Sequence, residues 1–500
     1  MSNTKTIAKN SLFLYFRMFL TMGVGLYTSR VVLNTLGIED FGVYSIVGGV
    51  VASFGFLSST ISSANSRFIS YAIGKNDQLY LRKIFSLANT NNFIIAFVIF
   101  LICEISGTWW INNKVVVPEG KMHLAHIIFQ ISLLSSMISL ISSSFVALII
   151  SYERMGVFAV TQLVQVILKL VVVFCLPYIS FNNALSYAFL LFLINIIFFV
   201  FYVLYCKKHF ICTTFKLNFS KDLKEIFSFS SWDLYGNFSV TARTEGISIL
   251  QNLFFGVGIN AAIGIANQVQ GAVSSFASSI LFASKPQVIK SYAQDNYEYM
   301  NDLIIKSAKY STLFLCFVIV PLIVELDYIV ALWLGVVPDY VLGLIKWFLL
   351  FVVGANISSC IMMGIHATGK IMMSSFINGT LYLLVVPISY FLFRKFHNPE
   401  IPYILNFCFV LIGANLNMIY FKKYVPSFSI LKIYQKAILP VFLVSFLNFL
   451  LLIYIKDFLN ADFMALVITI VISSTFIIIF SWLLLIEKEI KQFIIRKIWR

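Results

Sequence analysis

The chain has 500 residues, of which 60% are hydrophobic and 11% are charged, and its formal net charge is +15. A water-soluble domain is about half apolar and about a quarter charged, so this composition excludes a soluble enzyme or a soluble binding module. The apolar runs recur over the whole length, and helices are the form in which such runs satisfy their backbone polar groups within lipid. The sequence therefore predicts an all-α integral membrane protein.

Fourteen stretches of the chain are long and apolar enough to be transmembrane helices, which need about 20 residues each. The first six are residues 11–36, 41–63, 88–110, 123–150, 156–179 and 184–206. The next six are 228–255, 261–284, 309–333, 340–364, 371–393 and 401–421, and the last two are 437–456 and 463–486. The seventh and eighth are the most polar. The first is too long for a cleaved signal peptide and contains Arg17 and Arg30, so we expect it to be retained.

The positions of Lys and Arg orient these spans. With the N-terminus inside, the cytoplasmic segments hold 26 of these residues and the outer loops hold five. Cytoplasmic loops of membrane proteins carry such an excess, which accounts for the positive net charge without a nucleic-acid partner. We expect a multi-pass protein of the cytoplasmic (inner) membrane with both termini in the cytoplasm.

The sequence repeats itself weakly with an offset of 221 positions. Gly37 and Ile38 align with Gly258 and Ile259, and the segment Ser70–Ala72 aligns with Ser291–Ala293. An even number of spans separates the copies, so they would be parallel repeats. The predicted organisation is two six-helix bundles, residues 1–206 and 227–421, joined by a cytoplasmic linker, 207–226. Residues 422–500 add two more helices and a basic tail.

The seventh span carries a polar stripe at intervals of three and four residues, which places its members on one helical face. The stripe comprises Asp233, Asn237, Thr241, Thr244, Ser248 and Asn252, with Arg243 and Glu245 beside it. A helix with this pattern lines water or packs against polar neighbours. Arg243 is therefore either a cavity-lining cation or the partner of a carboxylate on another helix.

Other charged and polar residues fall within the spans. A charge in mid-bilayer costs about 2.5–3.5 kcal/mol and usually faces a cavity or a partner. Arg30 and Lys169 are candidate cavity residues, whereas Arg17 and Lys346 are close enough to span ends to reach the interface. Asn267 belongs to a small-residue stripe in the eighth span, which serves either close helix packing or cavity lining. The buried cations outnumber the acids, and this balance suits an anionic substrate such as a diphosphate.

The sequence lacks the motifs of soluble enzymes. The seven cysteines include no CxxC pair, and we expect no disulfide, no metal site and no cofactor. There is no Walker A motif, and the segment Gly256–Ala261 matches a nucleotide-binding glycine pattern without the strand that this pattern requires. The intramembrane residues are therefore the candidate site, and the protein is not expected to be an enzyme.

Two segments resemble a known family. The segment from Arg30 to Gly37, followed by Glu39–Ser45, is similar to the opening of bacterial polysaccharide-biosynthesis flippases. These are the Wzx-type, O-antigen transporter branch of the multidrug/oligosaccharidyl-lipid/polysaccharide (MOP, MATE-like) exporter superfamily. The loop Tyr152–Met155 resembles one often seen in these proteins, and the length, span number and repeat match over nearly the whole chain.

The resemblance implies a protein that moves an isoprenoid-diphosphate-linked oligosaccharide from the inner to the outer leaflet. Two six-helix bundles would alternate between inward-open and outward-open states, with substrate bound by a cationic cavity. We transfer that role to Arg30 and Arg243, and we assign possible ion coupling to Asp233 or Glu245. The implied partners are the lipid-linked substrate, membrane lipids and other polysaccharide-assembly membrane proteins.

Two other functions are compatible with a polytopic membrane chain. A cation-coupled multidrug antiporter of the same superfamily typically has a carboxylate in its first helices, where this chain has Arg17 and Arg30. A membrane glycan polymerase or ligase generally carries a large outer catalytic loop, whereas the longest outer loops expected here have about a dozen residues. A scaffolding protein would leave the intramembrane cations unexplained.

Overall fold

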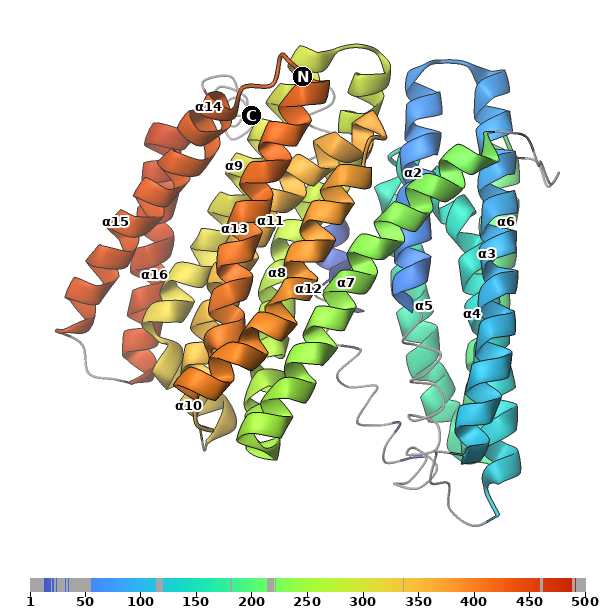
Figure 1. Ribbon diagram of the computed structural model, residues 1–500, viewed down its shortest axis with the longest axis horizontal. Helices are drawn as coiled ribbons and strands as arrows, with labels where there is room; N and C mark the ends of the chain where they lie inside the picture. Colours follow the sequence, from blue (N-terminus) through green and yellow to red (C-terminus); the bar gives the residue numbers. More distant parts are fainter. Residues whose placement is uncertain are drawn as a thin grey trace. The chain divides into compact units, whose positions relative to one another are not determined.

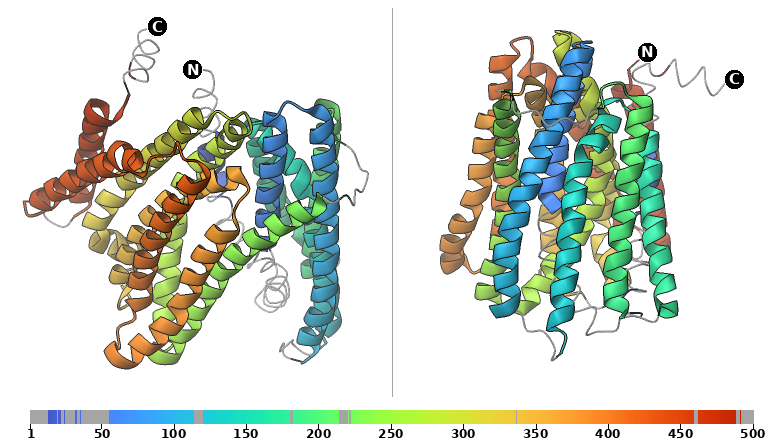
Figure 2. Two further views of the ribbon diagram at one scale, coloured as in Figure 1. Left: turned by 45° about the horizontal axis from the view of Figure 1, so that its top comes forward. Right: turned by 90° about the vertical axis from the view of Figure 1, so that its right-hand side faces the viewer.

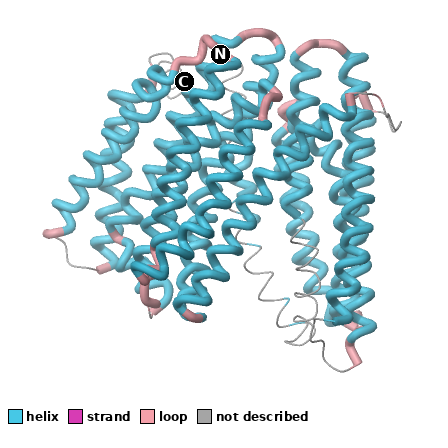
Figure 3. Tube along the Cα trace, viewed as in Figure 1, coloured by secondary structure: helices cyan, strands magenta, loops and turns pink. Residues whose placement is uncertain are grey.

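The computed structural model of the protein is helical throughout the part of the chain that it describes, with no strand among these residues (Figures 1 and 3). It describes residues 55–487 apart from 114–119, 180–181, 214–219, 221, 336 and 459–461, together with Lys491 and a few positions between 13 and 35. Most of the first and second expected spans, including Arg30, lies outside the described residues.

Ten helices in the described ranges are long and apolar enough to cross a membrane. They are Gln78–Asn113, Met122–Ser151, Met155–Tyr178, Asn183–His209, Tyr297–Val324, Val341–Thr368, Met372–Phe396, Ile401–Tyr424, Ile430–Lys456 and Phe463–Leu485. These helices confirm the expected multi-pass architecture, while the total of fourteen spans stays a prediction. The seventh and eighth spans are helices of 33 and 37 residues, α7 and α8. At 1.5 Å per residue they have sufficient length, but they are too polar to count among the ten.

The chain divides into two compact units. Unit 1 contains residues 1–237 and 289–295, and unit 2 contains residues 238–288 and 296–500. The boundaries fall within two helices, because α7 (Leu223–Phe255) and α8 (Val257–Ala293) each contribute to both units. Pro286 lies inside α8 just before its last turns pass to unit 1, at a point where proline removes a backbone hydrogen bond.

Unit 1 is built around one central helix. Its described elements are α2 (Gly55–Gly74), α3 (Gln78–Asn113), α4 (Met122–Ser151), α5 (Met155–Cys175), the 3-10 turn η1 (Leu176–Tyr178), α6 (Asn183–His209) and parts of α7 and α8. Helix α4 packs against α2, α3 and α6 (Figure 2). Asn92 of α3 donates to Ser143 Oγ of α4 at 2.9 Å and accepts from Asn65 Nδ2 of α2 at 2.9 Å. Interhelical polar contacts of this kind hold helices together where lipid removes the hydrophobic driving force.

Unit 2 has a similar plan. Its further elements are α9 (Tyr297–Val324), α10 (Leu326–Leu334), α11 (Val341–Thr368), α12 (Met372–Phe396), α13 (Ile401–Tyr424), α14 (Ile430–Ile433), the π-turn η2 (Tyr434–Ile438), α15 (Leu439–Lys456), α16 (Phe463–Phe480) and the π-turn η3 (Ser481–Leu485). Helix α11 is central and packs against α9 and α13. Asn356 of α11 donates to Ser311 and Thr312 of α9 at 2.8 and 3.0 Å.

The central helices α4 and α11 are the fourth spans of the two expected bundles, so the same position is central in each unit. This recurrence agrees with the expected fold class of two bundles in parallel repeat. The two remaining helices, α15 and α16, pack on each other and on α9 (Figure 1, red). Their attachment includes a buried polar contact, because Glu325 lies 3.5 Å from Lys456 of α15 and accepts from Thr469 of α16 at 2.8 Å.

Candidate functional site

The polar stripe of the seventh span lies on α7, and the unit boundary divides it. Asp233 and Asn237 belong to unit 1, whereas Thr241, Thr244 and Ser248 belong to unit 2. Asp233 is buried, and Asn237 donates to its backbone carbonyl at 2.9 Å. The residues of the stripe lie on one helix, and its two ends contribute to different units.

Arg243 is buried in unit 2, with 7% of its surface exposed. Its guanidinium carbon lies 4.4 Å from the ring centre of Tyr382 and 5.1 Å from that of Phe351. Its Nε and Nη1 atoms are buried without a hydrogen-bond partner. No carboxylate among the described residues forms an ion pair with it. The aromatic faces offset part of the desolvation cost, but they do not neutralise the charge.

A cavity of about 270 Å³ opens beside this guanidinium. Five of the site residues expected from the sequence line it, namely Arg243, Thr244, Glu245, Ser248 and Asn267. Further donors and acceptors come from Gln270 and Asn406, and the aromatic lining comes from Trp347, Phe348, Phe351 and Tyr403. The cavity thus combines a buried cation, neutral polar groups and aromatic faces.

Hydrogen bonds behind the lining hold two of these aromatic residues in place. Tyr403 donates its hydroxyl to Gln251 Oε1 at 2.8 Å, and Gln251 donates to the backbone carbonyl of Pro399 at 2.7 Å. Trp347 donates its indole N–H to Glu400 Oε2 at 3.1 Å. Because these rings cannot turn without breaking the hydrogen bonds, Trp347 of α11 and Tyr403 of α13 keep their orientation in the lining.

The other expected site residues lie elsewhere. Thr241 is exposed and does not line the cavity, and Arg30 lies outside the described residues. Lys169 is half-buried in α5 of unit 1 and has no ion-pair or hydrogen-bond partner within the described ranges. The described residues contain no cluster of three or more His, Cys, Asp or Glu side chains that could hold a metal ion. The roles of Arg30, Lys169, Asp233, Asn237 and Thr241 therefore stay predictions.

Sequence reasoning did not find the partners supplied by α11, α12 and α13. Trp347, Phe351, Tyr382 and Tyr403 lie in apolar spans where aromatic residues are common, and they carry no periodic signal that separates cavity lining from lipid contact. Asn406 was the one detectable sign, because a buried amide in an apolar span is costly unless it is paired or solvated.

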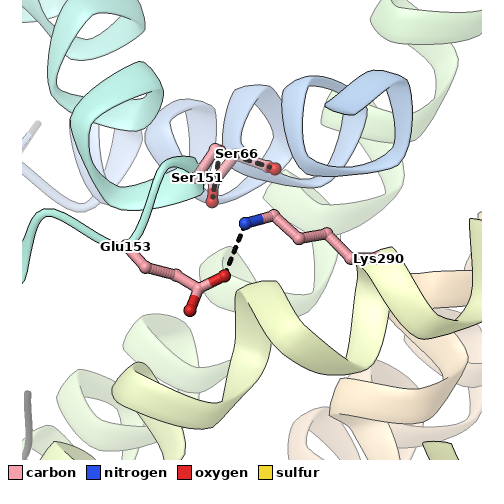
Figure 4. Close-up of polar contacts among 4 residues, drawn as sticks. All are labelled: Ser66, Ser151, Glu153 and Lys290. Atoms are coloured by element: carbon pink, nitrogen blue, oxygen red, sulfur yellow. Dashed lines mark hydrogen bonds and ion pairs between the residues drawn. The ribbon is translucent and has the colours of Figure 1, made fainter. Parts of the chain in front are cut away.

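A second group of charged residues in unit 1 was also missed. Lys290 of α8 donates to Glu153 Oε1 in the turn between α4 and α5, at 2.5 Å (Figure 4). Next to this pair, the hydroxyls of Ser66 and Ser151 lie 3.4 Å apart (Figure 4). The pair holds the last turns of α8 to unit 1, so it has a structural role that loop-charge counting could not detect.

No family model matches the chain, and no curated protein matches it. Solved structures do match. A multidrug resistance MATE family transporter of the MOP superfamily, in an outward-facing conformation, aligns with a TM-score of 0.73 at 13% identity over 85% of this chain and 97% of that one. MATE in the straight conformation gives a TM-score of 0.72 at 13% identity, covering 85% and 97%.

A MOP superfamily transporter from Pyrococcus furiosus gives a TM-score of 0.68 at 12% identity, covering 85% of this chain and 96% of that one. That protein is described as having a binding pocket of reversed polarity, which suggests a different function for it. Identities this low establish the fold alone. The chain has the fold of MATE/MOP superfamily transporters.

Proposed function

We propose that the protein is a flippase that moves an isoprenoid-diphosphate-linked oligosaccharide across the cytoplasmic membrane by alternating access. The substrate would be a repeat unit of an O-antigen, a capsule or an exopolysaccharide. The observation that carries the proposal is Arg243, a buried cation in a cavity with two donor nitrogens unpartnered and no described carboxylate paired with it. An arginine keeps its charge when buried and binds phosphate oxygens with several donors at once.

The size of the cavity supports an anionic head group as the ligand. Its volume of about 270 Å³ is near the lower end of ligand pockets, which range from about 300 to 1,000 Å³. A diphosphate fits this volume, whereas a whole oligosaccharide needs more space. Thr244, Ser248 and Asn267 would supply further hydrogen bonds to phosphate or to the first sugar. The isoprenoid tail would stay in lipid.

The remaining parts of the proposal come from sequence patterns. The Lys and Arg distribution favours cytoplasmic termini, so substrate would enter from the cytoplasmic leaflet and leave from the outer one. Arg30 and Lys169 are proposed as further substrate-binding cations, and Asp233 and Glu245 as sites of ion coupling. Other polysaccharide-assembly membrane proteins would receive the flipped substrate.

The decisive experiment uses a strain that lacks the gene and accumulates a lipid-linked glycan in the cytoplasmic leaflet. Wild-type protein should restore surface glycan. Arg243→Ala should lower the rate at which surface glycan appears by roughly 10–100-fold, because a hydrogen bond to a charged group contributes about 1.5–3 kcal/mol. Arg394→Ala is the matched control, because Arg394 is exposed at the end of α12 and contacts Tyr390. Full activity of Arg243→Ala at normal protein level would refute the proposal.

A cation-coupled multidrug antiporter is the second candidate, favoured by Glu245, an acidic residue that lines the same cavity. An organic cation would use this carboxylate and would be repelled by Arg243. The two functions predict opposite effects of the same variants. If the protein is an antiporter, Glu245→Gln should abolish drug resistance and Arg243→Ala should preserve it. Surface glycan should then be normal in the deletion strain.

A further inference from the structure

A second cavity, of about 970 Å³, lies in unit 2 at the end where α9 begins and α16 ends. One wall is the first half of α9, from Glu298 to Lys309. A second wall runs from Ser427 to Pro440, and a third consists of residues 483–487 with Lys491. This cavity shares no lining residue with the Arg243 cavity.

Most of the acidic side chains that line this cavity form ion pairs with lysines of α9. Lys306 lies 2.8 Å from Asp302 and 3.0 Å from Glu487. Lys309, which is 7% exposed, lies 3.7 Å from the other oxygen of Glu487. The remaining lining carboxylate, Glu298, is exposed in the first turn of α9.

The basic groups on the opposite wall are not neutralised. Lys432 and Lys436 are four residues apart, on one exposed face of the helix that continues into α15. Neither has an ion-pair partner within the described ranges. The hydroxyls of Ser427 and Ser429 line the same space. Two ammonium groups one turn apart, with hydroxyl donors beside them, form a receptor for a phosphate group.

The cavity also has an apolar side. Leu483 and Leu484 line it and are each 62% exposed, and Leu439, one turn beyond Lys436, is 65% exposed. Leucines exposed to this degree on a membrane helix face lipid chains. The lysines therefore stand at the boundary between the acyl region and the head-group region, where long basic side chains reach the interface.

We propose that this cavity binds the phosphate head group of an anionic glycerophospholipid. Lys432 and Lys436 contact the phosphate, and Leu483 and Leu484 contact the first methylenes of the acyl chains. A nucleotide is a poorer fit, because no aromatic side chain among the described lining residues can stack on a base. The proposal is independent of which substrate the Arg243 cavity transports.

The test measures lipid retention by the purified full-length protein in detergent, using native mass spectrometry. Wild type titrated with phosphatidylglycerol should bind it in preference to phosphatidylcholine. Lys432→Gln combined with Lys436→Gln should weaken phosphatidylglycerol binding by about 30-fold, as expected for two lysines at a membrane surface. Lys422→Gln combined with Lys423→Gln removes the same charge outside the cavity and should leave binding unchanged.

Two results would overturn the proposal. One is equal loss of lipid in both double variants, which would indicate general surface attraction. The other is displacement of the lipid by inorganic phosphate at millimolar concentration, which would indicate a site for soluble anions. Thermal unfolding of each variant in lipid-free detergent separates loss of the site from loss of the fold. None of these readouts depends on glycan transport, so failure here leaves the proposed flippase function standing.

Discussion

Lys290 and Glu153 form an ion pair whose side chains are only 18% and 11% exposed. The backbone of Glu153 is in the left-handed region, with φ of 60°, which costs about 1–2 kcal/mol for a residue other than glycine. The ion pair thus holds a strained turn between α4 and α5 against the end of α8 (Figure 4). It joins segments 137 residues apart in the chain.

Removing one member of this pair should destabilise the protein. Glu153→Gln leaves the Lys290 ammonium largely buried without its counter-charge, and we expect a loss of about 2 kcal/mol. This is below the 3–5 kcal/mol of fully buried pairs because both side chains retain some contact with solvent. The measurement is thermal unfolding of the purified protein in detergent.

The exposed pair Lys75 and Asp295 is the matched control. These groups are 3.9 Å apart with side chains 42% and 69% exposed, and Asp295 also has a left-handed backbone, with φ of 57°. Asp295→Asn tolerates that backbone and should change stability by less than about 0.5 kcal/mol. Equal losses of stability in the two variants would mean that burial of the Lys290–Glu153 pair does not stabilise the protein.

Gly74 is required by a close approach between α2 and the end of α8. A Cβ atom at this position would lie 2.7 Å from Ala293 Cβ and 2.9 Å from the carbonyl oxygen of Lys290. Because both are close to backbone, Gly74→Ala must displace a helix, and we expect a cost of about 1–3 kcal/mol. In α8, a Cβ at Gly271 meets no described atom within 4 Å. Gly271→Ala should therefore stabilise the helix by up to about 1 kcal/mol, and a destabilised Gly271→Ala variant would contradict the packing described here.

The two copies of the sequence repeat contact each other, and the alignment itself could not predict this contact. The aligned segments Ser70–Ala72 and Ser291–Ala293 lie together in unit 1, with the rings of Tyr71 and Tyr292 6.5 Å apart. Composition and loop charge were sufficient for the fold class, because span length and the positive-inside bias follow from the physics of the bilayer. They could not indicate that the end of α8 packs with unit 1, since that depends on tertiary contacts.

The candidate site was predictable only in part. Period-3.6 polarity identified the α7 face, because a polar stripe in an apolar span has few explanations. The same reasoning could not assign Asp233 and Ser248 to different units. Both lie on one helix that contributes to two units, and periodicity contains no information on domain boundaries. Nor could it select Phe351 or Tyr382, because an aromatic ring that contacts a guanidinium and one that contacts lipid look alike in sequence.

Glu325 joins the C-terminal helix pair to α9, and its side chain is 3% exposed. Glu325→Gln keeps a hydrogen-bond acceptor for Thr469 but leaves Lys456 without its counter-charge. Because the Lys456 side chain is 36% exposed, we expect a loss of about 1–2 kcal/mol, measured as thermal unfolding in detergent. Thr469→Val removes only a neutral hydrogen-bond partner. Its loss of stability should be about 1 kcal/mol smaller than the loss caused by Glu325→Gln. The reverse order of the two variants would indicate that the ion pair is not the important contact.

Cys212 lies in the loop after α6 and is fully buried, and burial raises the pKa of its thiol to about 11. An ordinary thiol has a pKa of about 8.5, so at pH 7.5 Cys212 should hold about 300-fold less thiolate. In a variant that retains only this cysteine, iodoacetamide labelling should be slow at pH 7.5 and should accelerate about tenfold per pH unit up to pH 10. The same protein in denaturant is the control, and it should label rapidly with a plateau above pH 9. A plateau at pH 9 in the folded protein would contradict the raised pKa.

Arg243→Met should raise stability while it abolishes function. The guanidinium is buried with two unpartnered nitrogens, and replacing an uncompensated buried charge by an apolar side chain of similar length removes a desolvation cost. We expect a gain of about 1–3 kcal/mol, seen as a higher thermal midpoint in detergent, together with loss of the glycan export proposed above. Lys309→Met is the contrasting variant, because Lys309 is equally buried but lies 3.7 Å from Glu487, and its loss should not stabilise. If Arg243→Met lowered the midpoint of thermal unfolding, Arg243 would be a structural residue with a partner. The proposal that its cavity binds an anion would then be refuted.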